Sequence, residues 1–396
     1  MNVKFSTKFV AASAAAVMAL SLAGCSGGSM DDSSSSGAKA SGDSITIGTV
    51  TTNSGTAAAY GEAEVKGFEL AVSEINAKGG INGKKVKLES MDDKGDATEA
   101  SNAYNKLAGD NNVLAVAGPT ISATTAAVAP LADQSKLVTI APAATSDSIE
   151  TGNYLFRTCF KDSYQGEVAA RFAAENLKVK KVAVLYGTGD PYSSGVGEAF
   201  AKAAEKLGLE VVDKESSSSA DDTEYSAQLQ KIQASGAELL YAPYYYSVAG
   251  PYIDPRTAAS VGFEGYVMGP DGYDGLKLTG DKSQYNKTYY TTHYSADDNT
   301  NTKVQDFIKS YKSKNNAEPN TFAALGYDTI YMIKQAIEKA GKNATREDVR
   351  NAVASMTFDG VTGKFTMDES GSPTKSVIVL EMKDGKPVYN TTVQPK

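Results

Sequence analysis

Segments with the pattern of buried β-strands alternate with amphipathic helical segments along this chain, and the alternation occurs twice. The first series starts at the β-branched stretch 45–51 and ends with the strand 136–142. The second starts with a helix after Arg157, continues through the strand 180–186 and reaches GYVMG at 265–269. Regular strand–helix alternation is typical of parallel sheets covered by helices. The sequence therefore predicts two α/β lobes, each with a parallel sheet.

The C-terminal part does not continue this alternation. Residues 302–355 are mostly helical in pattern, and residues 361–394 have the pattern of short strands with KDGK (383–386) as a hairpin turn. A chain of 396 residues is also long for a single hydrophobic core. Two domains are therefore expected.

A strand of each series ends in a loop of small or aromatic polar residues. In the first series the loop is GPTISA (118–123), and in the second it is APYYYS (242–247). Because ligands of parallel α/β sheets bind beyond the carboxyl ends of strands, the cleft between the lobes is the expected site. Ser122 lies where a helix begins, and the free N–H groups of a helix start suit a carboxylate. The alternative is that Ser122 serves only as an N-cap.

The N-terminus has the features of an export signal. Lys4 and Lys8 precede an apolar stretch that is too short to cross a bilayer comfortably. The end of this stretch, LAGC (22–25), resembles the bacterial lipobox, in which the cysteine is lipidated; the alternative is an ordinary signal with a chance cysteine. Residues 1–24 are predicted to be a lipoprotein signal peptide, Cys25 the lipidation site, and residues 25–43 a flexible tether.

Composition excludes several classes of function. A formal net charge of −8 without a basic block argues against binding of nucleic acid or of an anionic membrane surface. The single histidine, His293, excludes a His-rich metal site, and we interpret it as a strand residue in TYYTTHY. Cys159 is expected to be a lone buried thiol. No metal, cofactor or catalytic residue is expected, since residues 44–396 carry no nucleophile elbow, P-loop or H-E-x-x-H motif.

An ordered series of segments resembles the type I periplasmic solute-binding proteins, in particular those for branched-chain amino acids in ABC importers. The segments are AAAYGEAEVKGFELAVSEINAKGGINGKKVKLESMDD, GPTISATT, TIAPAATSD, LFRTCFKDSYQG and VMGPDG. The resemblance covers roughly residues 45–385. It implies two Rossmann-like lobes joined by a three-crossing hinge. The first lobe is expected at 44–161 plus 295–362, and the second at 162–294 plus 363–394.

The resemblance also implies how an amino acid is held by its charged groups. Ser122 and Thr145 donate to the α-carboxylate, together with a backbone N–H of Ala143 or Ala144. Asp271 accepts from the α-ammonium group at a position that is usually Glu in this family, so the reach is one methylene shorter. Read from the residues alone, Thr145 is as well explained as a turn residue, and Asp271 as part of an Asp-Gly turn.

Tyrosines are expected to close the cleft. By the same resemblance, Tyr192 and Tyr244 cover the ligand from the second lobe, and Tyr60 lines the side-chain pocket from the first. A flat apolar face with a polar tip suits this role. Tyr245 and Tyr246 fit simple packing equally well, and alternation along an extended segment prevents all of residues 244–246 from reaching one pocket.

The function implied by the resemblance is that of an extracytoplasmic, lipid-anchored binding protein, expected to be a monomer. It captures a branched-chain or other apolar amino acid and delivers it to the permease of an ABC transporter. The alternative is a sensor, or a protein of the same fold that binds another solute, such as an amide or a small aromatic acid. A receptor fused to a transmembrane helix is not expected, because no long apolar segment follows residue 24.

Overall fold

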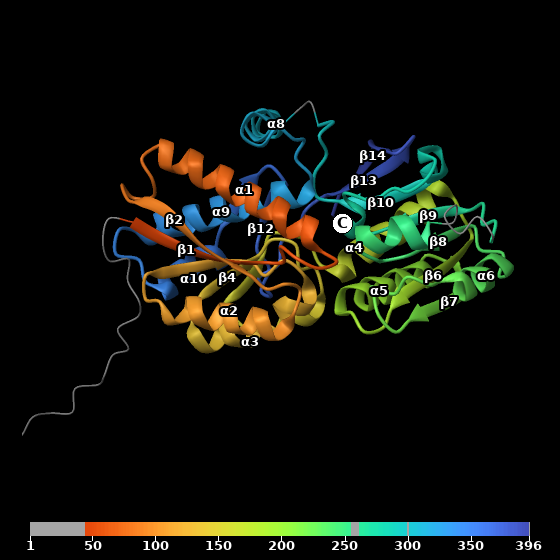
Figure 1. The fold of residues 1–396 in the computed structure, drawn as a ribbon, viewed down its shortest axis with the longest axis horizontal. Coiled ribbons are helices and arrows are strands. Elements are labelled where there is room, and N and C mark those ends of the chain that lie inside the picture. Colours follow the sequence, from red (N-terminus) through yellow and green to blue (C-terminus); the bar gives the residue numbers. More distant parts are fainter. Residues whose placement is uncertain (1–43, 255–260, 299–300, 396) are drawn as a thin grey trace, which may run out of the picture. The chain divides into compact units, whose positions relative to one another are not determined.

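A computed structural model describes residues 44–254, 261–298 and 301–395 of the protein (Figure 1). The predicted signal peptide, the predicted tether and Cys25 lie outside the described residues. No helix in the described ranges is both long and apolar enough to cross a lipid bilayer.

The first lobe contains a five-stranded parallel sheet in the order β2-β1-β3-β4-β5. All residues of the central strand β3 are buried, as expected for a parallel strand whose two faces are both covered by helices. The strands are β1 (Ser44–Thr51), β2 (Lys85–Asp92), β3 (Val113–Ala117), β4 (Val138–Ala141) and β5 (Leu155–Arg157).

Helices cover both faces of this sheet, with α1 and α9 packed together on one face and α2 and α3 on the other (Figure 1). The α1–α9 contact is close because glycines lie in it: a Cβ on Gly67 would be 2.2 Å from the carbonyl oxygen of Ala323. The helices are α1 (Ala58–Ala77), α2 (Ala97–Gly109), α3 (Ser122–Ser135), α8 (Thr302–Asn315), α9 (Thr321–Ala340) and α10 (Arg346–Ala354). This close approach brings the first turn of α9 to the cleft.

The second lobe contains a seven-stranded sheet in the order β14-β13-β10-β9-β8-β6-β7. Its strands are β6 (Lys181–Gly187), β7 (Glu210–Ser217), β8 (Leu239–Tyr241), β9 (Tyr266–Gly269), β10 (Thr288–Thr292), β13 (Val377–Lys383) and β14 (Lys386–Val393). Its helices include α4 (Asp162–Phe172), α5 (Pro191–Lys206) and α6 (Ser226–Ala234). Strands β6 to β10 form the predicted parallel part of this sheet, and β13 and β14 extend it at one edge, where β13 pairs antiparallel with β10 and with β14.

The antiparallel pairing of β13 with β14 follows from the hairpin that joins them. Asp384 and Gly385 both have positive φ, 51° and 76°, as a tight two-residue hairpin turn requires. The predicted KDGK turn is confirmed. A short hairpin can only produce antiparallel neighbours, so the C-terminal strands extend the sheet without a helix between them.

The chain passes between the two sheets after β5, after β10 and after the hairpin of β11 (Thr357–Gly360) and β12 (Gly363–Thr366). Phe358 and Phe365 of this hairpin both pack into the first-lobe core. The third crossing therefore follows Thr366, whereas the predicted boundary at 362/363 would divide two paired strands.

The segment after β8 is less regular than predicted. A helix is expected near 247–261, but the structure has a single helical turn, α7 (Tyr246–Val248), followed by a π-helical turn over Ala249–Ile253. The end of the predicted helix, from residue 255 to 260, lies outside the described residues.

Candidate functional site

One small cavity lies where strands of the two sheets end. Its walls come from the segments that follow β3, β4, β8 and β9, together with the first turns of α1, α5 and α9. It measures about 20 Å³, room for about one water molecule. The lining residues are Tyr60, Thr120, Ile121, Ser122, Ala143, Tyr192, Tyr245, Asp271, Gly272 and Phe322. Five predicted site residues are among them: Tyr60, Ser122, Ala143, Tyr192 and Asp271.

The two lobes touch directly at this cavity. The Tyr60 hydroxyl of the first lobe donates to the Gly272 carbonyl at 2.5 Å and accepts from the Tyr246 N–H at 2.9 Å. The Ser247 hydroxyl donates to the Thr56 carbonyl at 2.9 Å. Binding sites for small molecules enclose far more space than this cavity, about 300–1,000 Å³. We therefore infer that a ligand reaches the cavity only when the lobes separate.

The start of α3 forms one wall. Ser122 is the first residue of the helix, and its N-cap is Ile121, whose side chain offers no capping acceptor. The Ser122 hydroxyl accepts from the Ser146 N–H at 3.1 Å, which ties the helix start to the loop after β4. The alternative that Ser122 serves only as an N-cap is therefore wrong. The helix start keeps N–H donors that no side chain caps, and these suit an anion.

The loop after β4 contributes Ala143 to the same wall, whereas Ala144 and Thr145 are buried behind it. The Ala144 carbonyl accepts from the thiol of Cys159, which is buried and free as predicted. The Thr145 hydroxyl lies beside Asp162, the first residue of α4. The structure thus places Ala144 and Thr145 one layer behind the wall, since the loop turns away from the cavity after Ala143.

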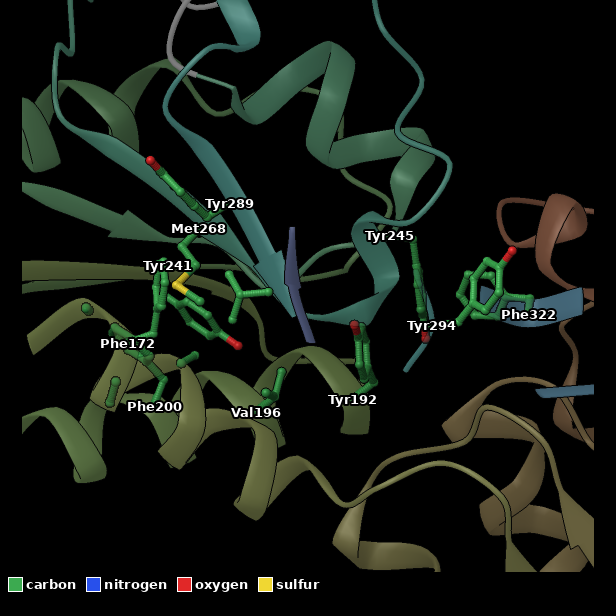
Figure 2. Close-up of a cluster of buried hydrophobic side chains, with 14 of the residues drawn as sticks. Phe172, Tyr192, Val196, Phe200, Tyr241, Tyr245, Met268, Tyr289, Tyr294 and Phe322 are labelled. Atoms are coloured by element: carbon green, nitrogen blue, oxygen red, sulfur yellow. The ribbon is translucent and has the colours of Figure 1, made fainter. Parts of the chain in front are cut away.

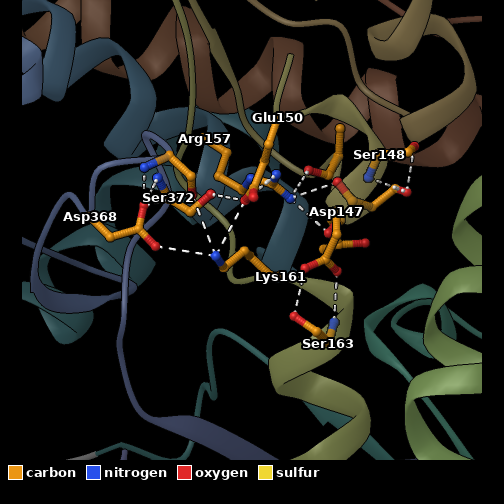
Figure 3. Close-up of polar contacts among 12 residues, drawn as sticks. Asp147, Ser148, Glu150, Arg157, Lys161, Ser163, Asp368 and Ser372 are labelled. Carbon is orange, nitrogen blue, oxygen red and sulfur yellow. Dashed lines mark hydrogen bonds and ion pairs between the residues drawn. The ribbon is translucent and has the colours of Figure 1, made fainter. Parts of the chain in front are cut away.

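A buried arginine holds this loop in place (Figure 3). Nη1 of Arg157 donates to the carbonyls of Thr145 and Ser146 at 2.7 and 3.0 Å. Nη2 donates to the Glu150 carboxylate at 3.0 Å, and Lys161 lies 3.5 Å from the same carboxylate. Only 2% of the Arg157 side chain is exposed. The sequence reasoning missed this residue, because a basic residue at a strand end has no local feature that predicts burial.

The opposite wall carries a buried carboxylate, Asp271, in a 3₁₀ turn that follows β9. Its Oδ1 accepts from the Tyr192 hydroxyl at 2.9 Å and from Nε2 of Gln165 at 3.2 Å. Its Oδ2 lies 3.3 Å from Nε2 of His293. Asp271 does form the Asp-Gly turn of the alternative interpretation, but its side chain also reaches the cavity. The cavity therefore has a wall of N–H and hydroxyl groups and a wall with a carboxylate.

A family model described as periplasmic binding protein matches residues 44–387 of this chain. The chain belongs to the periplasmic binding protein family. It is 31% identical over 353 residues to the Leu/Ile/Val-binding protein homolog 3 of Brucella melitensis, with 86% of this chain and 92% of the relative covered. It is 30% identical over 334 residues to a leucine-, isoleucine-, valine-, threonine- and alanine-binding protein of Pseudomonas aeruginosa, with 83% and 87% covered.

A solved structure supports the same assignment. The substrate-binding protein of a branched-chain amino acid transporter from Streptococcus pneumoniae, in complex with isoleucine, has a TM-score of 0.82 and 31% identity. The match covers 89% of this chain and 100% of that chain. The predicted fold, two α/β lobes of the periplasmic-binding-protein type, is thus confirmed.

Tyr245, and not the predicted Tyr244, faces the cavity of this binding protein. Tyr244 points away from the cavity: its hydroxyl hydrogen-bonds to Ser217 Oγ at 2.8 Å, and its ring packs edge-on against Tyr225. Tyr245 lines the cavity instead and stacks on Tyr192 with a centroid distance of 5.3 Å (Figure 2). Neighbouring side chains of an extended segment point to opposite sides, so the choice of Tyr245 excludes Tyr244.

Phe322 is a wall residue that the sequence reasoning missed. It lies in the first turn of α9, and its ring stacks on Tyr60 with centroids 3.9 Å apart. Nothing in the local sequence indicates this role, because Phe322 comes from a helix far along the chain that glycine packing brings against α1. Ile121 and Tyr245 complete the apolar part of the wall.

Thr120 also lines the cavity and connects it to a buried acid. Its hydroxyl donates to Oε2 of Glu64 at 2.6 Å. Burial raises the pKa of Glu64 well above its usual range, against the opposing hydrogen bond from Thr120. Burial thus favours the neutral form of Glu64, so that less negative charge lies next to the helix start that suits an anion.

His293 lies just after a strand and not within it, as the sequence had suggested. β10 ends at Thr292, and the His293 ring is fully buried and stacks on Phe160 with centroids 3.6 Å apart. Burial is the largest influence and lowers the pKa of His293 to about 4, although the hydrogen bond to Asp271 opposes it. The imidazole is therefore neutral near pH 7 in the folded protein.

This shift predicts a pH dependence of stability. Between pH 4 and the unfolded value of about 6.5, the unfolded chain binds more protons at His293 than the folded chain does. The contribution of His293 to the free energy of unfolding therefore falls as the pH falls through that window. Relative to His293→Phe, the natural protein should lose about 2 kcal/mol of unfolding free energy between pH 7 and pH 5. Urea unfolding of both proteins at each pH measures the difference.

That comparison isolates His293, because it is the only histidine in the chain. Burial also raises the pKa of Asp274 to about 6. The contribution of Asp274 to the free energy of unfolding therefore rises as the pH falls, opposite to that of His293. Asp274 is present in both proteins, so its effect cancels in the difference. Unfolding free energies that change in parallel with pH would contradict the prediction.

Proposed function

We propose that this protein is an extracytoplasmic binding protein that captures an α-amino acid with an apolar side chain between its lobes and delivers it to an ABC permease. The observation that carries the proposal is the division of one cavity into two polar walls. The uncapped start of α3 with Ser122 and Ala143 suits a carboxylate, and Asp271 suits an ammonium group. An α-amino acid carries both groups on one carbon.

The rest of the wall supports an apolar side chain. Tyr60, Ile121, Tyr245 and Phe322 present rings and an aliphatic chain to the cavity. The relatives described above are named as binding proteins for leucine, isoleucine and valine, one of them also for threonine and alanine. We propose the same class of ligand here, with a branched-chain amino acid as the first candidate.

Capture works by closure. Only when the lobes meet are both charged groups of the ligand buried, so the ligand stabilises the closed form by its higher affinity for that form. The Tyr60 hydroxyl bonds to Gly272 and Tyr246 hold the lobes together beside the ligand. The closed protein then docks on the permease as a monomer without a cofactor.

A binding screen tests this function. Ligand-stripped protein is heated with each common amino acid, with the matching carboxylic acids that lack the amino group, with simple amides and with benzoate. A ligand present at about a hundred times its Kd should add roughly 2.7 kcal/mol of stability. We expect leucine, isoleucine or valine to stabilise the protein, and small-angle X-ray scattering to show compaction with the same solute. Stabilisation by amides or benzoate alone would instead support the alternative ligand class.

We also propose that the protein is anchored to the outer face of the cell membrane through a lipid on Cys25. The support is the LAGC sequence at 22–25 behind an apolar stretch with two lysines, followed by a polar, Ser-rich tether. We expect Cys25→Ser to release the mature protein from the membrane fraction into the soluble extracytoplasmic fraction. Cys159→Ser is the matched control and should leave the distribution unchanged. Equal membrane association of both variants would contradict lipidation at Cys25.

A further inference from the structure

The carboxylate of Asp271 is held by three side chains of different elements. Tyr192 and Gln165 donate to Oδ1 at 2.9 and 3.2 Å, and Nε2 of His293 lies 3.3 Å from Oδ2. Tyr192 lies in the first turn of α5, Gln165 in α4, and His293 after β10. With hydrogen bonds to both oxygens, the carboxylate plane cannot rotate freely. Its remaining lone pairs therefore have a defined direction at the cavity wall.

Within this set Tyr192 lines the cavity, whereas His293 and Gln165 do not. Tyr192 is itself part of the wall, and Gln165 also bonds to Asp162 and Thr291, so changes to either would disturb more than Asp271. The His293 ring stacks on Phe160 and hydrogen-bonds to Asp271. Because Asp271 lines the cavity and His293 does not, the hydrogen bond to Asp271 is the direct route by which this side chain can affect ligand affinity.

The protonated nitrogen of His293 follows from its partner. An ionised carboxylate only accepts hydrogen bonds, so the neutral imidazole must carry its proton on Nε2 to bond with Oδ2. The other ring nitrogen, Nδ1, has no hydrogen-bond partner within the described residues, which fits an unprotonated atom. The stack on Phe160 holds the ring in the plane that directs Nε2 at Asp271.

We propose that His293, as the Nε2–H tautomer, is a positioning residue that aims Asp271 at the α-ammonium group and so makes the cleft prefer α-amino acids to the matching carboxylic acids. This inference rests on the proposed function, because it assigns the ammonium group to Asp271. It adds a residue that never touches the ligand but determines which ligands bind. A hydrogen bond to a charged group is strong enough for an effect of about tenfold on affinity.

The test compares two His293 variants with two matched ligand pairs. His293→Phe keeps a ring on Phe160 but removes the donor, and His293→Gln keeps a donor near the position of Nε2. Leucine is compared with 4-methylpentanoate, and valine with 3-methylbutanoate, by calorimetric titration of the full protein. We expect His293→Phe to raise the Kd for the amino acids about tenfold and to leave the Kd for the carboxylic acids unchanged. His293→Gln should recover most of the preference.

Thr288→Val is the matched control, because Thr288 is a buried residue of β10 that bonds to Asp254 and not to Asp271. It should leave both sets of Kd values unchanged. An equal rise for amino acids and carboxylic acids in His293→Phe would show a general structural role and overturn the proposal. Unchanged values for all ligands would overturn it as well.

Two results separate this proposal from the proposed function. If the natural protein prefers amino acids and His293→Phe keeps that preference, only the role of His293 fails. If the natural protein binds no amino acid more tightly than its matching carboxylic acid, both fail. The nitrogen NMR spectrum of the single imidazole gives a readout that needs no ligand. We expect the Nε2–H tautomer at pH 7, and an Nδ1–H tautomer would overturn the proposal.

Discussion

Replacing Asp271 by asparagine is expected to weaken binding of an α-amino acid by about a hundredfold to a thousandfold, or about 3–4 kcal/mol. The loss has two physical causes. The ligand ammonium group loses its charged partner in a buried site, where such a pair is strongest. In addition, Tyr192, Gln165 and His293 all direct donors at this side chain, so the amide nitrogen of asparagine would face a donor. Calorimetric titration with leucine, isoleucine and valine measures the change.

The control for this prediction is Asp254→Asn. Asp254 is a buried carboxylate of the same lobe that accepts from Thr288 and does not line the cavity. Its replacement should change the affinity less than threefold in protein that is still folded. If Asp271→Asn binds the amino acid within threefold of the natural protein, the ammonium group binds elsewhere and the orientation of the ligand must be revised.

Replacing Arg157 by methionine is expected to lower the free energy of unfolding by about 3 kcal/mol and to weaken ligand binding about tenfold. Methionine keeps much of the chain length but removes the donors to the carbonyls of Thr145 and Ser146 and the partner of Glu150. Breaking a buried ion pair costs about 3–5 kcal/mol, and the lower end applies here because Lys161 still lies beside Glu150. Urea unfolding gives the first quantity, and titration of the folded variant gives the second.

Affinity should fall because the loop that presents Ala143 loses its anchor. Arg346→Met provides a matched control, since Arg346 also donates to three backbone carbonyls, those of Val113, Ala108 and Asp110. These carbonyls lie at the start of β3 and at the end of α2, away from the cavity. Arg346→Met should destabilise the protein and leave the affinity unchanged. A loss of stability without a loss of affinity in Arg157→Met would show that the loop keeps its shape without this clamp.

Strand ends could be predicted from the sequence, and with them the location of the cavity. Runs such as NVLAVAG and GYVMG identify buried parallel strands, whose carboxyl ends meet at one edge of a sheet. Ser122, Ala143 and Asp271 each follow such a strand within a few residues, and all three line the cavity. Local pattern predicts that they lie at strand ends, whereas their choice as ligand-binding residues came from the resemblance to the family.

The direction of individual side chains could not be predicted in the same way. Tyr244 and Tyr245 are chemically identical neighbours, and only the orientation of the extended segment after β8 decides which one faces the cavity. Thr145 belongs to a predicted loop, but the turn after Ala143 places it behind the wall. The hairpin of β13 and β14 was visible as a turn and expected in the second lobe, but its antiparallel pairing with β10 was not.

By itself, the sequence determined the two α/β lobes and the strand ends where the cavity lies. Its export and lipidation signals stay predictions, because residues 1–43 lie outside the described residues. These features are periodic or contiguous, so they can be read from neighbouring residues. Only the tertiary structure showed the contacts of Arg157, His293 and Phe322. The ring partner of Phe322 is far away in the sequence, and Arg157 and His293 lie in separate segments from the loops that they contact. Burial gives such side chains their contacts only when those segments pack together.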